Sequence, residues 1–268
     1  MDAARPAFSG SIPEVYQSLM VPMLFDPYAL DLADRAAAIA PSSILELAAG
    51  TGVVTRQLAL TLPGEATITA TDLSQGMVDE AASQPTARPV TWAVADAMSL
   101  PFADESFDLV VCQFGVMFFP DKPTAFAEMR RVLRPGGSVI FSVWDGFDDN
   151  EFVAVVDAAL ADFFPESPPS FMADLPHGYH DPEQIRRDLA GGGFKTGVRI
   201  ETVTRQSTSP SAEAAAVAYC QGNPMRLEIE RLGSIEAATA HVAQALAARF
   251  GSGPIHGRIQ AQVVTAVR

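Results

Sequence analysis

The stretch that decides the fold is SILELAAGTG, residues 43–52. The apolar run from Ser43 to Leu47 predicts a buried strand, and the helical spacing of apolar residues over Val53–Leu62 predicts a helix behind it. Between them, Gly50 and Gly52 form a turn in which the backbone can approach a ligand closely. The stretch therefore predicts a strand, a turn suited to binding a ligand, and a helix.

The same alternation continues along the chain. Further strands are predicted over Ala66–Thr71, Val90–Ala95, Phe107–Gln113, Ser138–Trp144, Val198–Arg205 and Ile259–Val267. Helices are predicted over Pro13–Ile39, Ser74–Ser83, Lys122–Leu133, Glu151–Phe163, Asp181–Ala190, Glu213–Cys220 and Leu227–Phe250. Strands that are apolar on both faces and alternate with helices indicate a parallel sheet covered on both sides. We therefore expect an α/β fold, a Rossmann-like doubly wound sheet of seven mostly parallel strands.

We expect a single integrated domain with three parts. Residues 1–42 would form an N-terminal helical lid, and residues 43–145 would form the Rossmann-like core that carries the ligand-binding turn. Residues 146–268 would supply the last two strands and a helical cover over the site of a second, small molecule. Phenylalanines gather in this last part and predict an apolar chamber, although they could equally pack the cover onto the sheet: Phe147, Phe152, Phe163, Phe164 and Phe171.

Composition excludes several classes of function. The 268 residues include 18 basic and 32 acidic side chains, so the formal net charge of −14 argues against binding to nucleic acid or to an anionic membrane surface. The most hydrophobic stretch, Leu109–Phe119, is interrupted by Gln113 and is too short to span a membrane. The first residues lack the pattern of a secretion signal, and two cysteines are too few for a disulfide scaffold. We expect a cytoplasmic protein, with a homodimer as one option for its oligomeric state.

The charges at the strand ends favour one kind of cofactor. Ligands of an open parallel sheet bind beyond the carboxyl ends of its strands, and Glu46 ends the first strand. This carboxylate would repel a pyrophosphate and attract a cation, and Thr55 stands where a dinucleotide motif has its third glycine. S-adenosylmethionine carries an ammonium and a sulfonium but no phosphate. Asp72 ends the second strand, about 20 residues beyond Gly52, where a carboxylate can accept both hydroxyls of a ribose.

Three more side chains suit a nucleoside. Leu73 and Met77 are one helical turn apart and could form an apolar wall for adenine. Asp96 follows the third strand, where it could accept a hydrogen bond from the adenine amino group. Structural roles remain as alternatives, since Asp96 could cap its own turn and Met77 could be ordinary core.

Taken together, the ordered segments resemble a class I S-adenosylmethionine-dependent methyltransferase. The resemblance is strongest to the small-molecule (type 11) group that includes ubiquinone/menaquinone-biosynthesis enzymes. The segments that carry it span about half of the chain: Ile44–Gly52, Ala70–Met77, Asp96–Phe102, Ser106–Val110 and Arg131–Gly137. One departure is Ala48, where many relatives have glycine, and alanine is also small.

The resemblance implies a role for each matching residue. The methionine part of the cofactor would be held by the first turn, namely Glu46, Ala48, Gly50, Thr51 and Gly52. The ribose would bind Asp72, and the adenine would bind Leu73, Met77, Asp96 and Ala97. Gln113 and Phe114 would border the methionine ammonium and the methyl-transfer channel, and Tyr16 would close over the cofactor as a lid or, alternatively, pack its own helix.

The implied reaction is methylation of a small, fairly apolar molecule at oxygen, carbon or nitrogen, with S-adenosylhomocysteine as product. Positioning can supply much of such catalysis, so no catalytic residue is assigned. His177 and His180 are the candidates if a base is needed, although His180 and Asp181 could merely cap a helix. No histidine pair has metal-ligand spacing, and no metal is expected. Two other functions stay open, an NAD-dependent oxidoreductase and a non-catalytic nucleoside-binding regulatory protein.

Overall fold

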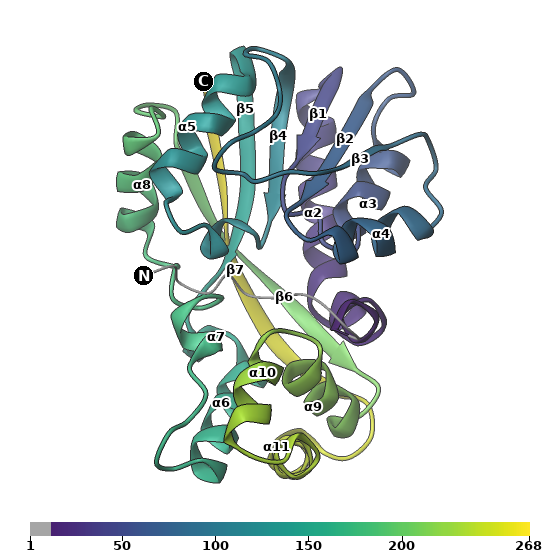
Figure 1. The fold of residues 1–268 in the computed structure, drawn as a ribbon, viewed down its shortest axis with the longest axis vertical. Helices are drawn as coiled ribbons and strands as arrows, with labels where there is room; N and C mark the ends of the chain where they lie inside the picture. Colours follow the sequence, from purple (N-terminus) through teal and green to yellow (C-terminus); the bar gives the residue numbers. More distant parts are fainter. Residues whose placement is uncertain (1–11) are drawn as a thin grey trace. The chain divides into compact units, whose positions relative to one another are not determined.

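The computed structural model describes residues 12–268 and contains a seven-stranded sheet in the order β3-β2-β1-β4-β5-β7-β6 (Figure 1). The strands are β1 (Ser43–Glu46), β2 (Thr67–Asp72), β3 (Thr91–Val94), β4 (Phe107–Gln113), β5 (Leu133–Trp144), β6 (Arg199–Ser209) and β7 (Ile255–Val267). The first five pair in parallel, and β7 pairs with β5 in antiparallel orientation. The predicted seven-stranded, mostly parallel α/β sheet is confirmed. Residues 1–11 of the expected lid lie outside the described residues.

The order of the strands reverses at β1. The chain runs outward from β1 through α3 (Val53–Thr61), β2, α4 (Gln75–Ser83) and β3, then returns to β4 on the other side of β1. Because crossovers are right-handed, this reversal puts α3 and α4 on one face of the sheet and α5 (Lys122–Val132) on the other. The α5 helix packs against α8 (Pro182–Gly191) (Figure 1). A ligand is therefore expected beyond the carboxyl ends of β1 and β4.

The structure corrects two predicted helices. Leu227–Phe250 is two helices, α10 (Met225–Leu232) and α11 (Ile235–Phe250), because the Ser234 side chain accepts a hydrogen bond from the Ala237 amide and starts a new helix. Pro13–Ile39 is also divided, into α1 (Ile12–Val15), the π-helical segment η1 (Tyr16–Phe25) and α2 (Asp26–Ile39). Pro22 lies inside η1 and has no N–H to continue an α-helical ladder.

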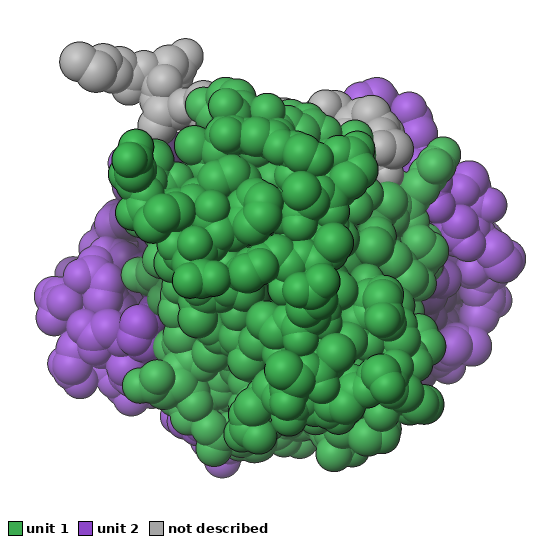
Figure 2. All heavy atoms as spheres, turned by 90° about the horizontal axis from the view of Figure 1, so that it is seen from below, with its two compact units in different colours: residues 1–27, 145–178, 204–260 green, residues 28–144, 179–203, 261–268 purple. Residues whose placement is uncertain are grey.

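Two compact units make up the chain, and Figure 2 colours them green and purple. Unit 1 comprises residues 1–27, 145–178 and 204–260, and unit 2 comprises residues 28–144, 179–203 and 261–268. Unit 2 holds the five parallel strands with α3, α4, α5 and α8. Unit 1 holds η3 (Phe147–Asp149), α6 (Glu151–Phe163), α7 (Phe171–Asp174), α9 (Ala212–Gln221), α10 and α11. The division into residues 1–42, 43–145 and 146–268 stays a prediction.

Each unit has its own apolar core. Leu45, Val110 and Phe141 on neighbouring strands of unit 2 are fully buried, as are Phe152 and Leu246 among the packed helices of unit 1. Burying one such side chain stabilises a fold by about 1.5–3 kcal/mol. Over residues 12–268, no helix has both the length and the apolar character that crossing a membrane requires.

Candidate functional site

The turn after β1 has the backbone conformation that the sequence predicts for close approach to a ligand. Ala48, Gly50 and Gly52 all have left-handed φ values, 51°, 56° and 82°. Glycine adopts this conformation freely, whereas Ala48 does so at a cost that is typical of functional sites. A Cβ atom on Gly52 would lie 2.8 Å from the Trp92 ring, so the turn also has no room for a side chain there.

Glu46 lies at the base of this turn, buried at 2% exposure. Its Oε2 accepts a hydrogen bond from the Thr55 hydroxyl at 2.6 Å. Burial raises the pKa of Glu46 to about 8, while the Thr55 hydrogen bond and the positive charge of Arg56 oppose that shift. Glu46 is therefore mostly protonated at neutral pH until a cation lies beside it. In the sequence, Thr55 is notable only because it occupies the position of the third glycine of a dinucleotide motif. Nothing in the sequence indicates that its hydroxyl is the hydrogen-bond partner of Glu46.

Asp72 connects the end of β2 to the same turn. Its Oδ2 accepts a hydrogen bond from the Gly50 amide at 2.9 Å, and its Oδ1 accepts one from the Ser74 amide at 2.8 Å. Burial raises the pKa of Asp72, and these two amides oppose the shift. Each carboxylate oxygen can accept a second hydrogen bond, so the predicted ribose contact is compatible with the tether. Asp72 thus also shapes the turn, a role that the sequence does not reveal.

The end of β4 packs against the turn after β1. Phe114, which follows the half-buried Gln113, has a φ of 53°, and its amide donates to the Ser142 carbonyl at 3.0 Å. The Phe114 ring stacks on Trp144 with centroids 3.8 Å apart. A Cβ atom on Gly115 would lie 2.5 Å from the Cβ of Ala48. The two turns therefore touch where the order of the strands reverses, and sequence analysis missed both Gly115 and Trp144.

We expect Gly115→Ala to destabilise the fold by about 1–3 kcal/mol, because the added methyl group overpacks the contact with Ala48 and Cys112. Urea unfolding measures the change. Gly64→Ala is the matched control, since a Cβ atom there meets nothing within 4 Å. Equal stability of the two variants would contradict close packing between the turns.

The predicted adenine residues differ in exposure. Leu73 is 47% exposed directly after β2, whereas Met77 is buried at 3%. Asp96 accepts a hydrogen bond from the Met98 amide at 2.9 Å, so it caps its own turn, and Ala97 beside it is half-buried. The adenine roles of these four residues stay predictions.

Thr51 has an unusual polar atom in the turn. Its side chain is buried at 1% exposure, and its Oγ1 has no hydrogen-bond partner within the part of the chain that the structure describes. Buried hydroxyls normally have a partner, so this atom suits a ligand that supplies one.

The remaining candidates lie apart from this turn in the sequence. In unit 1, the Tyr16 ring stacks on Phe25 with centroids 5.0 Å apart, and His177 is buried at 7% exposure. In unit 2, His180 is exposed, and Asp181 caps α8 by accepting a hydrogen bond from the Glu183 amide. The role of Tyr16 as a lid stays a prediction, as does a role for either histidine as a base.

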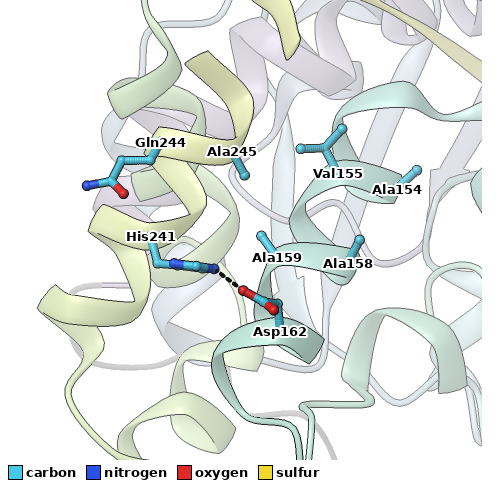
Figure 3. A pocket seen from close by; sticks show the side chains of 8 residues that line it. All are labelled: Ala154, Val155, Ala158, Ala159, Asp162, His241, Gln244 and Ala245. Carbon is cyan, nitrogen blue, oxygen red and sulfur yellow. Dashed lines mark ion pairs between the residues drawn. The ribbon is translucent and has the colours of Figure 1, made fainter. Parts of the chain in front are cut away.

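Unit 1 also contains an open pocket of about 520 Å³ between α6 and α11 (Figure 3). Its lining consists mainly of small side chains and one ion pair: Ala154, Val155, Ala158, Ala159, Asp162, His241, Gln244 and Ala245. His241 Nε2 lies 3.1 Å from Asp162 Oδ2, as the dashed line in Figure 3 marks. None of the predicted site residues lines this pocket.

Comparison with known sequences identifies relatives for the core. The family described as "Methyltransferase domain" matches residues 45–141. A malonyl-[acyl-carrier protein] O-methyltransferase of Hahella chejuensis is 42% identical over 38% of this chain, and the match covers 36% of that protein. The ubiquinone/menaquinone biosynthesis C-methyltransferase UbiE of Geotalea daltonii is 30% identical over 57% of this chain and 70% of its own length. The chain thus spans about a third of the length of the first relative and most of the second.

Solved structures share the fold. Phosphoethanolamine N-methyltransferase 2 of Haemonchus contortus, solved with phosphomonomethylethanolamine and S-adenosylhomocysteine, gives a TM-score of 0.59 at 17% identity. That match covers 96% of this chain and 56% of the other. The YcgJ protein of Bacillus subtilis gives a TM-score of 0.56 at 17% identity, over 90% of this chain and 98% of the other. At these identities the similarity establishes the fold alone.

Proposed function

We propose, because this chain belongs to the class I S-adenosylmethionine-dependent methyltransferases, that it transfers a methyl group from S-adenosylmethionine to a small, fairly apolar acceptor. One observation carries the proposal. A buried acid, Glu46, lies at the base of a left-handed glycine turn that Asp72 holds in place through the Gly50 amide. This arrangement suits a positively charged ligand with a ribose.

The residues of the turn fit the cofactor. An ammonium or sulfonium beside Glu46 would stabilise its carboxylate form, which burial otherwise disfavours. The methionine part of the cofactor would supply a hydrogen-bond partner to the buried Thr51 hydroxyl. The adenine ring would supply an apolar contact to the exposed Leu73 side chain. A pyrophosphate carries no positive charge to stabilise the Glu46 carboxylate, so the buried acid favours a cationic cofactor over NAD.

We assign the binding residues accordingly. The methionine part contacts the turn after β1 and the end of β4, namely Glu46, Ala48, Gly50, Thr51, Gly52, Gln113 and Phe114. The ribose contacts Asp72, and the adenine contacts Leu73, Met77, Asp96 and Ala97. Tyr16 serves as a lid, and residues 146–268 select the acceptor.

The bound cofactor supplies an electrophilic methyl group on a sulfonium. This chain contributes positioning. Glu46 would hold the positively charged part of the cofactor in a buried setting, and the turn that Asp72 tethers would fix the orientation of the cofactor. Asp72 fixes the ribose with the carboxylate oxygens that already hold the Gly50 and Ser74 amides. Alignment of a nucleophile with the methyl group can supply much of the rate enhancement of a displacement at carbon.

Isothermal titration calorimetry tests the proposal, because we expect the chain to bind S-adenosylhomocysteine at one site and to give no heat with NAD. Binding of NAD in place of S-adenosylhomocysteine would instead make the chain an oxidoreductase candidate. Binding of S-adenosylmethionine without methylation of any member of a broad acceptor panel would favour a regulatory protein.

A further inference from the structure

The turn after β4 has a strained backbone that its surroundings must hold in place. Phe114 is the first residue beyond β4 and has a φ of 53°. A residue other than glycine adopts this left-handed conformation only at a cost in free energy, and it persists where neighbouring contacts fix it. Such residues cluster at functional sites. The contacts that hold Phe114 in this conformation are therefore part of how the site is built.

Strand β5 holds both the ring and the backbone of Phe114. Trp144 is the last residue of β5, which lies beside β4 in the sheet (Figure 1). The buried rings of Phe114 and Trp144 stack with centroids 3.8 Å apart and planes that differ by only 6°. The Phe114 amide donates to the carbonyl of Ser142, also in β5, at 3.0 Å. Loss of the stack would leave this one hydrogen bond to hold the turn on the side of β5.

Tyr28 packs edge-on against both rings of the stack. Its ring centroid lies 5.2 Å from that of Phe114 and 5.5 Å from that of Trp144, with interplanar angles of 88° and 87°. Aromatic rings favour this edge-to-face geometry. The Tyr28 hydroxyl donates to the Val203 carbonyl on β6 at 3.0 Å. All four residues belong to unit 2, so the cluster joins α2 and β6 to the end of β4 within one compact unit.

The stacked residue lies next to the turn that follows β1. Gly115 directly follows Phe114, and a Cβ atom on Gly115 would lie 2.5 Å from the Cβ of Ala48. Ala48 is itself left-handed, with a φ of 51°. Because close-packed groups transmit displacement to one another, a shift of the backbone at Phe114 would also displace the turn after β1. The stack therefore supports both turns at the point where the order of the strands reverses.

Packing of the core alone does not require this arrangement. Phe126 and Phe141 form another buried aromatic pair of unit 2, with centroids 5.3 Å apart, and they lie within α5 and β5, where the backbone is regular. The pair of Phe114 and Trp144 instead fixes a left-handed residue at the carboxyl ends of two parallel strands, where ligands of this fold bind.

We propose that Trp144 is a positioning residue of the cofactor site, an inference that rests on the proposed function. Through the stack, Trp144 keeps Phe114 left-handed and so fixes the backbone of Gln113 and Phe114 against the methionine part of S-adenosylmethionine. Trp144 does not touch the cofactor and takes no part in the transfer of the methyl group. It contributes preorganisation, because a turn that already has its binding conformation loses less conformational freedom when the ligand arrives.

Isothermal titration calorimetry with S-adenosylhomocysteine tests the proposal on the full chain. We expect Trp144→Leu to weaken binding about tenfold in Kd, and Trp144→Phe, which keeps a ring for the stack, to weaken it by no more than about twofold. Phe126→Leu is the matched control, since it removes a ring from a buried pair away from the turn and should leave Kd unchanged. Urea unfolding shows whether each variant is folded under the conditions of the titration. Unchanged affinity in a folded Trp144→Leu variant, or equal weakening in Phe126→Leu, overturns the proposal.

A double-mutant cycle tests whether Trp144 acts through Phe114. Phe114→Gly adopts the left-handed conformation freely and has no ring to stack. In that background we expect Trp144→Leu to change Kd by less than about twofold, because the stack is already absent. A loss of equal size in both backgrounds would show that Trp144 acts independently of Phe114, and the proposal would be wrong.

Phe114→Leu provides the test if Trp144→Leu does not fold, because it removes the stack and leaves Trp144 in place. Affinity equal to that of the unaltered chain would then overturn the proposal. Failure of the unaltered chain to bind S-adenosylhomocysteine would instead reject the proposed function. Binding of the same strength with and without the stack would reject only the role of Trp144.

Discussion

S-adenosylhomocysteine should bind this chain up to about 50-fold more tightly as the pH rises from about 6 to about 8, and Glu46→Gln should remove that dependence. Burial raises the pKa of Glu46 from 4.5 to about 8, so the side chain is protonated over most of this range. The ammonium of the ligand favours the carboxylate, so binding must release a proton. Each pH unit below the pKa of Glu46 therefore costs up to about tenfold in affinity.

Calorimetry in buffers with different ionisation enthalpies counts the released proton. We expect close to one proton for the unaltered chain below pH 7 and none from this group in Glu46→Gln. Thr55→Val is a matched variant, because it removes the hydroxyl that stabilises the Glu46 carboxylate and should move the dependence to higher pH. Affinity that is independent of pH in the unaltered chain would show that Glu46 does not face the cation.

The protonation of Glu46 changes the reason for which a cationic ligand is preferred. From the sequence alone, we expect Glu46 to be permanently ionised, and its negative charge favours a cationic sulfur nucleoside over a pyrophosphate. The structure buries that acid at 2% exposure with Thr55 as a hydrogen-bond partner, so the charge develops only when a cation arrives. The preference for a cation survives, because a neutral carboxyl gains by ionising beside an ammonium, whereas a pyrophosphate keeps it protonated.

The parallel core could be predicted because its signals are local. A strand buried on both faces is a short apolar run, and β4 was predicted at its observed bounds, Phe107–Gln113. Errors arose where a local signal was overlooked or was weak. Ser234 is an N-cap residue between α10 and α11, yet the apolar periodicity runs across it. β5 begins at Leu133, ahead of the predicted Ser138, because Leu133 pairs with Phe107 across an irregularity in the ladder.

The contacts that build the site could not be predicted, since they depend on directions in space. Asp72 was identified by its place after a strand, but its bond to the Gly50 amide requires the left-handed turn to point that amide at it. Likewise, His177 was a candidate by residue type alone. Its contact with the Asp145 carbonyl joins two segments whose proximity no sequence pattern indicates.

Asp72→Ala should weaken S-adenosylhomocysteine by about 1.5–3 kcal/mol, which is roughly 10- to 150-fold in Kd, the scale of hydrogen bonds to a charged group. The variant removes the predicted acceptor of the ribose hydroxyls. It also frees the Gly50 and Ser74 amides that the carboxylate holds, so the glycine turn loses its tether to β2. Calorimetry measures the total effect, and urea unfolding shows how much of it is a loss of fold stability.

Adenosine and 2′,3′-dideoxyadenosine separate the two contributions of Asp72, because they differ only in the ribose hydroxyls. If Asp72 accepts from those hydroxyls, the unaltered chain binds adenosine more tightly than the dideoxy compound, and Asp72→Ala binds the two alike. If Asp72 acts only through the turn, the variant weakens both compounds by the same factor and the preference for adenosine remains. The second result would remove Asp72 from the ribose site while leaving it as the residue that holds the Gly50 amide.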